Sequence, residues 1–337
     1  IAAITFTVSA IGTGAVNDLN WFIFYRIFGG IGIGIASNLS PMYIAEVSPS
    51  HVRGKFVSIN QLTIVLGILA AQFVNWLIAE PVVPGENILE TWNGQMGWRW
   101  MFWAEVVPSA LFFILIFFIP ESPRWLATKL QYGKAENILS HIGGKEYAKK
   151  EIESIKTVIS ATKEKLNIRM LFQSKIPGIL LIGIVIAAFQ QWCGLNVVFN
   201  YAQEIFAAAG YGVSDILFNI VVTGVTNVIF TFVGMYTVDK LGRRSLMLFG
   251  ASGLAIIYII MGICYYLNIT GMAVLIMVVL AIACYAMTLA PVTWVVLSEI
   301  FPNRIRGMAM AVSTFSLWVA CFVLTYTFPL LNSGLGA

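Results

Sequence analysis

The chain has 337 residues, of which 59% are hydrophobic and 11% are charged, and its formal net charge is +4. This composition lies far outside the range of soluble globular proteins and is typical of a chain that crosses a lipid bilayer several times. The modest positive charge does not indicate a nucleic-acid partner, because the basic residues are confined to particular loops.

Nine apolar runs follow one another, each near or above the roughly 20 residues that a helix needs to cross a bilayer. The runs are residues 1–16, 21–47, 55–79, 98–120, 176–208, 215–238, 246–267, 271–297 and 307–330. They predict an all-α polytopic membrane protein. The sequence begins inside the first run without a methionine, so we expect it to be a fragment.

The connections between these runs alternate in charge. Four of them carry 18 of the 20 lysines and arginines and are predicted to be cytoplasmic by the positive-inside rule, namely residues 48–55, 121–175, 239–245 and 298–307. The opposite connections hold acids, amides and interfacial tryptophans and are expected outside, namely residues 16–20, 80–97, 210–215 and 267–270. We therefore expect a multi-pass protein of the cell membrane, the cytoplasmic membrane if the source is bacterial.

The long segment 121–175 interrupts the hydrophobic pattern with Glu and Lys pairs at helical spacing. It predicts a few short cytoplasmic helices that divide the membrane part in two. We expect a partial N-terminal lobe of four spans over residues 1–120, this helical segment over 121–175, and a partial C-terminal lobe of five spans over 176–337.

The run after this segment carries polar side chains where lipid-facing residues are expected. Gln190, Gln191 and Asn196 are costly in hydrocarbon unless they line a cavity or find partners. In a straight helix Gln191 and Asn196 would point about 140° apart, so they converge only if the backbone unwinds near Gly194. Discontinuous helices of this kind build the substrate sites of secondary transporters. The alternative is that the amides hydrogen-bond neighbouring helices together.

Two segments share the pattern Glu-x-x-Pro-x-x-x-Arg-Gly, at residues 46–54 and 299–307. The first follows the second apolar run and the other follows the eighth, both on the cytoplasmic side. Equivalent ends in the same orientation indicate parallel repeats six spans long. If the two halves match, the parent protein has twelve spans, of which this chain covers nine.

The repeated ends bring together acids and arginines that could latch the two lobes when the cytoplasmic side is closed. Exposed ion pairs are individually weak, about 0–1 kcal/mol, and the alternative is that these charges set topology only. Their repetition at equivalent places favours a gate. The candidate gate residues are Glu46, Arg53, Asp239, Arg243, Arg244, Glu299 and Arg306.

Six motifs resemble the sugar porters of the major facilitator superfamily, with bacterial D-xylose and proton symporters and glucose facilitators as the nearest members. They are YRIFGGIGIG at 25–34, PMYIAEVSPSHVRG at 41–54, PESPRWL at 120–126, FQQWCGLN at 189–196, VDKLGRRS at 238–245 and PVTWVVLSEIFPNRIRG at 291–307. The resemblance extends over nearly the whole chain. It implies the major facilitator fold of two six-helix lobes, and transport of a neutral monosaccharide by alternating access, without a cofactor or a metal.

The resemblance also implies which side chains hold the sugar. Its hydroxyls are bound by amides and its C–H surface is covered by aromatic faces. The matching positions are Gln61, Gln190, Gln191, Asn196, Asn227, Trp294 and Trp318. Asn227 and Trp318 each fall about eleven residues into their runs, which places both near the midplane at about 1.5 Å per residue. Packing is the alternative role for each tryptophan.

Four positions depart from the family pattern and leave the particular sugar open. Asn200 stands where an aromatic residue is common, and Ala290 where glycine is common. Ile68 and Leu317 replace polar residues of the xylose-type site. Each polar group lost removes a hydrogen bond worth about 0.5–1.5 kcal/mol.

For coupling, the resemblance implies that Arg26 pairs with an acid on a span that lies outside this sequence. Facilitators of the family carry this arginine as well. We expect symport of a pentose or hexose with protons, with an uncoupled facilitator, an inositol or polyol transporter, and a non-transporting sugar sensor as alternatives. An enzyme is disfavoured, because no nucleophile, metal cluster or paired acid lies at membrane depth with a histidine nearby.

Overall fold

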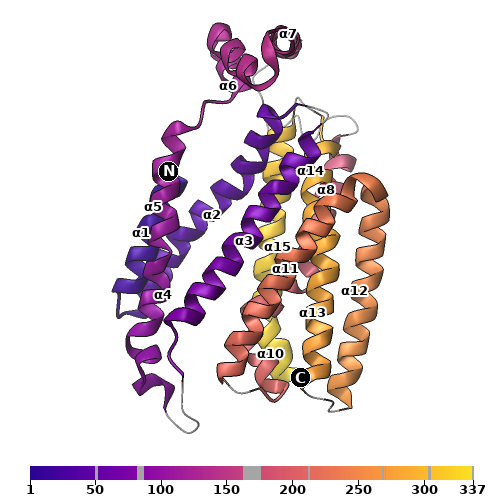
Figure 1. The fold of residues 1–337 in the computed structure, drawn as a ribbon. Helices are drawn as coiled ribbons and strands as arrows, with labels where there is room; N and C mark the ends of the chain where they lie inside the picture. Colours follow the sequence, from indigo (N-terminus) through magenta and orange to yellow (C-terminus); the bar gives the residue numbers. More distant parts are fainter. Residues whose placement is uncertain are drawn as a thin grey trace.

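The computed structural model describes residues 1–49, 52–81, 87–161, 176–211, 213–267, 269, 271–302 and 305–335. All regular elements within these ranges are helical (Figure 1). Eight of the nine predicted runs form spans that are long and apolar enough to cross a bilayer. The first run forms a helix of 14 residues. The chain is therefore an all-α polytopic membrane protein.

The first group of helices precedes the segment 121–175 in the sequence. It comprises α1 (Ala2–Ala15), α2 (Leu19–Val47), α3 (Arg53–Ile78), η1 (Ile88–Glu90), η2 (Asn93–Gly97), α4 (Trp98–Ala104), α5 (Val106–Leu115) and η3 (Ile116–Phe118). Helix α1 packs on α2 through small residues, because a Cβ atom on Gly29 or Gly32 would collide with a side chain of α1. Close approach between small residues is a common way for helices to associate in a membrane.

The C-terminal end of α1 is fixed by an arginine of α4. The Arg99 guanidinium donates hydrogen bonds of 2.7 Å to the carbonyl oxygen of Gly14 and 2.8 Å to that of Val16. These carbonyl oxygens lie at the C-terminal end of α1, where no further turn of helix supplies donors and a cation is favourable. Arg99 therefore joins α1 to the span that contains α4 and α5.

Helices α6 (Pro123–Thr128) and α7 (Tyr132–Ala161) lie beyond one end of the membrane helices (Figure 1). Helix α7 is interrupted at Gly144, whose φ of 86° is a left-handed conformation that glycine adopts without strain. The short helices predicted in this segment are thus present in its described part. They bury a small apolar cluster of their own, which includes Leu126, Leu139 and Ile152.

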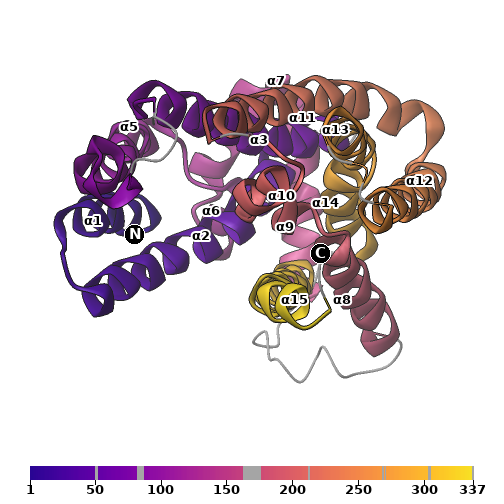
Figure 2. The same ribbon diagram turned by 90° about the horizontal axis from the view of Figure 1, so that it is seen from below.

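The second group follows the segment 121–175. It comprises α8 (Ile176–Trp192), α9 (Leu195–Asn200), α10 (Ala202–Ala208), α11 (Val213–Leu241), α12 (Arg243–Tyr266), α13 (Met272–Met287), α14 (Leu289–Ile300) and α15 (Arg306–Leu335). Helix α8 lies beside α15 within this group, while α3 of the first group lies beside α11 in both views (Figures 1 and 2). The α3–α11 contact therefore joins the two groups.

Two spans of the second group are discontinuous. Helix α8 ends at Trp192, and Gly194, at a φ of 81°, begins α9, which confirms the predicted break. The other break is at Thr288, between α13 and α14, where the sequence indicated one continuous run over 271–297. Pro291 lacks the N–H that would bond the carbonyl oxygen of Met287 in a continuous helix. The missing hydrogen bond therefore weakens the helix at this second break.

Candidate functional site

A cavity of about 480 Å³ lies between the two groups of helices, within the roughly 300–1,000 Å³ that is usual for small-molecule sites. Side chains of α1, α2, α3 and α5 line it from one side, and side chains of α8, α9, α11, α13, α14 and α15 line it from the other. The lining includes all seven side chains predicted to hold a ligand, namely Gln61, Gln190, Gln191, Asn196, Asn227, Trp294 and Trp318. The structure thus brings these residues together from five spans.

The amides beside the α8 break form a chain of hydrogen bonds. Asn196 Nδ2 donates to Gln191 Oε1, and Gln191 Nε2 donates to Gln190 Oε1 at 2.8 Å. Gln190 Nε2 in turn donates to the Tyr285 hydroxyl at 2.6 Å. Asn196 reaches Gln191 because the left-handed Gly194 redirects the chain between them. Tyr285 belongs to α13. Sequence reasoning missed this residue, because nothing in an apolar run indicates that its tyrosine will hydrogen-bond to Gln190, 95 residues away.

Neighbouring helices hold this break in place. The Tyr258 hydroxyl of α12 donates to the carbonyl oxygen of Cys193 at 2.7 Å, which satisfies an acceptor at the end of α8. Tyr201, just after α9, donates its hydroxyl proton to the carbonyl oxygen of Thr325 at 3.0 Å. The backbone around Gly194 is therefore tied to α12 and α15, so the amides project from a supported turn.

Two further amides complete the polar lining. Asn227 of α11 is 3% exposed, and its Oδ1 atom has no hydrogen-bond partner among the residues that the structure describes. A buried acceptor without a partner costs about 1–3 kcal/mol, so this atom favours a ligand that donates a hydrogen bond. Gln61 of α3 is also buried, on the side of the cavity formed by the first group.

The remaining lining is apolar and aromatic. Trp294 of α14 is buried, whereas Trp318 of α15 is 39% exposed. Ile68 and Leu317, the departures noted above, also line the cavity, whereas Asn200 and Ala290 are absent from its described lining. The cavity therefore combines polar amides with apolar surface, as a ligand with hydroxyl groups and C–H faces requires.

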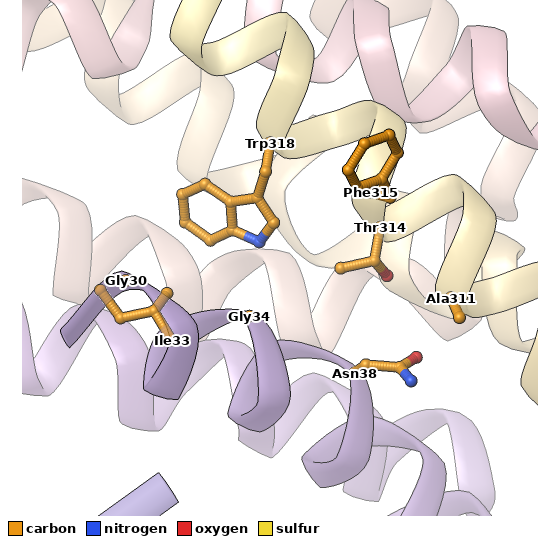
Figure 3. Close-up of a pocket in the computed structure, with 8 residues that line it drawn as sticks. All are labelled: Gly30, Ile33, Gly34, Asn38, Ala311, Thr314, Phe315 and Trp318. Atoms are coloured by element: carbon orange, nitrogen blue, oxygen red, sulfur yellow. The ribbon is translucent and has the colours of Figure 1, made fainter. Parts of the chain in front are cut away.

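A second cavity of about 500 Å³ lies between α2 and α15 and shares Ile33 and Trp318 with the first. Figure 3 shows the Trp318 indole between the two helices, with Asn38 and Thr314 nearby. Asn38 Oδ1 and Thr314 Oγ1 are buried and have no partner within the described part of the chain. Trp318 therefore borders both spaces.

The candidate coupling residue Arg26 lies on α2 and is not part of the described cavity lining. Its guanidinium lies 5.3 Å from the centre of the ring of Phe102, three residues before Glu105 in the sequence. Glu105 lies between α4 and α5 within a membrane span. Sequence reasoning missed it, although an acid inside an apolar run is itself a signal of function.

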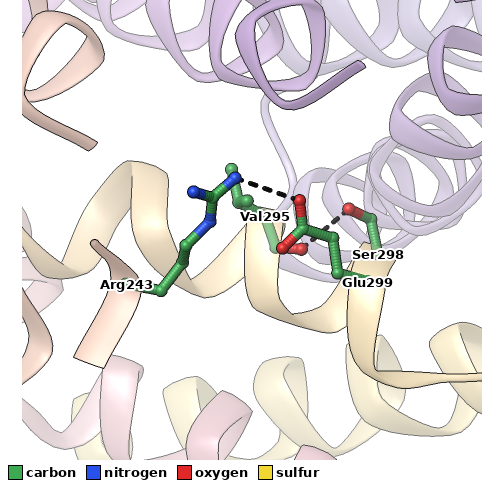
Figure 4. Close-up of polar contacts among 4 residues, drawn as sticks. All are labelled: Arg243, Val295, Ser298 and Glu299. Atoms are coloured by element: carbon green, nitrogen blue, oxygen red, sulfur yellow. Dashed lines mark hydrogen bonds and ion pairs between the residues drawn. The ribbon is translucent and has the colours of Figure 1, made fainter. Parts of the chain in front are cut away.

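The predicted gate residues lie at the ends of the spans next to α6 and α7 (Figure 1). Among those described, one ion pair is formed, and it lies within the second group of helices and not between the two groups. Arg243, at the start of α12, approaches the Glu299 carboxylate near the end of α14 at 3.2 Å (Figure 4). Glu46 instead accepts a hydrogen bond from the Ser122 hydroxyl. Arg244 is exposed, and Arg306, at the start of α15, is partly buried. The side chains of Arg53 and Asp239 lie outside the described part of the structure.

Eight membrane-crossing spans that surround an amide-lined cavity, with broken helices at its wall, define a membrane transporter of a small polar molecule. The whole chain, residues 1–337, matches the family model described as Sugar (and other) transporter. The chain belongs to this family.

Several curated proteins are similar along nearly the whole chain. The D-xylose-proton symporter of Escherichia coli K12 is 38% identical over 98% of this chain and 70% of its own length. The arabinose-proton symporter of Bacillus subtilis is 35% identical over 99% of this chain and 71% of its own. The glucose transport protein of Synechocystis sp. is 37% identical over 100% of this chain and 74% of its own.

A solved structure is also similar. The proton:xylose symporter XylE bound to 6-bromo-6-deoxy-D-glucose, a protein of the major facilitator superfamily, superposes with a TM-score of 0.85 at 38% identity. The match covers 98% of this chain and 72% of that one. The fold of this chain is therefore the major facilitator fold, and the protein is a multi-pass protein of the cytoplasmic membrane.

Proposed function

We propose that this protein transports a neutral monosaccharide, a pentose or a hexose, across the membrane by alternating access and in symport with protons. The observation that carries the proposal is that the seven predicted side chains, which come from both groups of helices, line the same cavity. Relatives named as xylose-proton and arabinose-proton symporters and as glucose transporters support the substrate class.

The chemistry of the lining favours an uncharged polyol. Among the described lining residues none carries a formal charge, so an anionic or cationic substrate would be buried without a counter-ion. Each amide offers both a donor and an acceptor to a hydroxyl group. Asn227 Oδ1 is a buried acceptor without a donor among the described residues, and a sugar hydroxyl is a suitable donor.

Alternating access needs two rigid bodies that move about the site. We take these bodies to be the lobes 1–120 and 176–337, with the helical segment 121–175 between them on the cytoplasmic side. The proposal is supported by the position of the cavity, whose lining comes from both lobes. Rotation of one lobe against the other would then expose the same amides to each side in turn.

For proton coupling we propose the pair of Arg26 and Glu105. Glu105 lies within a membrane span, and the Arg26 guanidinium lies against the ring of Phe102, three residues before it. A carboxylate in such a span is a group that can bind and release a proton during a transport cycle. An uncoupled facilitator is the second candidate, since relatives also include a glucose facilitated diffusion protein of Zymomonas mobilis.

The test is radiolabelled sugar counterflow with the full-length protein in proteoliposomes, over a panel of pentoses, hexoses and inositol. We expect saturable exchange of at least one monosaccharide, and accumulation against a gradient when an inward proton gradient is imposed. Exchange without proton-driven accumulation would favour the facilitator. Saturable binding without any exchange would identify a sensor and refute transport.

A further inference from the structure

We propose that Tyr285 is a positioning residue that sets the stereospecificity of the sugar site, an inference that rests on the proposed function. Its hydroxyl anchors the row of amides that runs from Gln190 through Gln191 to Asn196. The amides bind the sugar hydroxyls, and the hydrogen bond between Gln190 and Tyr285 fixes how those amides are oriented.

The hydroxyl of Tyr285 is a fixed point. The side chain is 8% exposed and lies in the last turn of α13, directly before the break at Thr288. Its neighbours in the apolar core include Leu195, Leu254 and Ile282. An aromatic side chain with two rotatable bonds in such packing loses little further freedom, so it presents its oxygen to Gln190 Nε2 at 2.6 Å without rearrangement.

The glutamines, by contrast, are long and have many rotamers. Ordering a glutamine side chain costs up to about 1.5–2 kcal/mol in conformational entropy. In this protein the row itself orders the glutamine, because Gln190 Nε2 is held by Tyr285 and Gln190 Oε1 by Gln191 Nε2 at 2.8 Å. These contacts therefore preorganise the site.

The chain also correlates the amide orientations. If Gln190 alone turned over, its NH₂ group would face the NH₂ group of Gln191, and a hydrogen bond would become a repulsion. A hydroxyl can donate as well as accept, so the row can reverse only as a whole, from Tyr285 to Asn196. The cavity therefore offers a sugar one of two complete donor and acceptor patterns, which is the property that separates epimers.

The substitution Tyr285→Phe removes one oxygen atom and leaves the ring in place. We expect the affinity of the preferred sugar to fall roughly two- to ten-fold, as for loss of one hydrogen bond. The affinity ratio between that sugar and an epimer differing at one hydroxyl is expected to move towards one. Calorimetric titration of the full-length protein with both sugars measures the two quantities.

Tyr258→Phe is the matched control, because it also removes a hydroxyl that holds the α8 region, through the carbonyl oxygen of Cys193. It touches the backbone and not the amide row. We expect it to lower the melting temperature and to leave the epimer ratio unchanged. An equal change of the ratio in both variants would overturn the proposal, since general loosening of the region would then explain it.

A double-mutant cycle separates positioning from direct sugar contact. If Tyr285 acts through Gln190, then Tyr285→Phe changes neither affinity nor epimer ratio in a Gln190→Ala background. An effect that persists there overturns the positioning role in favour of direct contact. If Tyr285→Phe has wild-type affinity and a wild-type epimer ratio, the positioning role is refuted, but the proposed function stands as long as the wild type binds sugar. If the wild type binds no sugar, both the positioning role and the proposed function are refuted.

Discussion

Truncation of Gln191 tests whether the amide row binds sugar or only joins helices. Gln191 is 7% exposed and lies in the middle of the row, accepting from Asn196 and donating to Gln190 at 2.8 Å. Gln191→Ala leaves a bound sugar hydroxyl without a partner. A buried unpaired group costs about 1–3 kcal/mol, so we expect sugar affinity to fall roughly five- to a hundred-fold.

The structure adds an effect on folding to this prediction. The same truncation removes the donor to Gln190 Oε1 and the amide acceptor of Asn196 Nδ2, so we expect the melting temperature to fall as well. Calorimetric titration and a melting curve on one purified sample of the full-length variant separate the two effects. A lowered melting temperature with unchanged affinity in the folded fraction would refute the binding role and leave the amides as interhelical contacts.

A matched control lies on α3. Gln72 faces α11 close to Gly224, and its Oε1 atom is buried without a partner among the described residues. It is not part of the described cavity lining. Gln72→Ala therefore removes a membrane-embedded glutamine without touching the site, and we expect wild-type sugar affinity. A loss of affinity equal to that of Gln191→Ala would show that any glutamine truncation in this bundle disturbs the cavity.

Three further predictions concern the gate, the second helix break and coupling. Glu299→Arg breaks a pair that joins α12 to α14 within the second group and is worth about 0–1 kcal/mol. If this pair supports the predicted gate, the population open at that end of the spans should rise by up to about five-fold; cysteine accessibility measures this, and added Arg243→Glu should reverse it. Gly234→Ala would place a Cβ atom 2.7 Å from a carbonyl oxygen at the end of α13. It should therefore lower the stability measured in a melting assay by about 1–3 kcal/mol. The control Gly262→Ala has open space around the new Cβ atom and should be neutral or stabilising. Glu105→Gln should abolish accumulation driven by a proton gradient and preserve sugar counterflow; unchanged accumulation would remove Glu105 from the coupling mechanism.

The sequence was sufficient for features that depend on local pattern. The spans follow from the length of their apolar runs, and the break at Gly194 follows from amides that cannot share one face of a straight helix. The break at Thr288 was not predicted, because Pro291 lies in a run whose hydropathy is uninterrupted. A proline in a membrane span is tolerated with or without a break, so its effect depends on the neighbouring helices.

Features that depend on pairs distant in the sequence could not be derived from it. The bond between Gln190 and Tyr285 spans 95 residues, and that between Glu46 and Ser122 spans 76. Opposite charges at the repeated ends predicted an arginine partner for Glu46. A serine hydroxyl is a short-range partner, and its proximity is decided by the path of the chain after α5, which composition does not reveal.

The link between Glu46 and Ser122 has a mechanical consequence. Two hydrogen bonds connect the C-terminal end of α2 to the start of the helical segment: the Ser122 hydroxyl donates to Glu46, and the Tyr43 hydroxyl donates to the carbonyl oxygen of Pro120 at 2.7 Å. Ser122 is also the residue that caps α6. The first turn of α6 is thus attached to the end of α2. If α2 tilts during transport, α6 and α7 would move together with it as one unit.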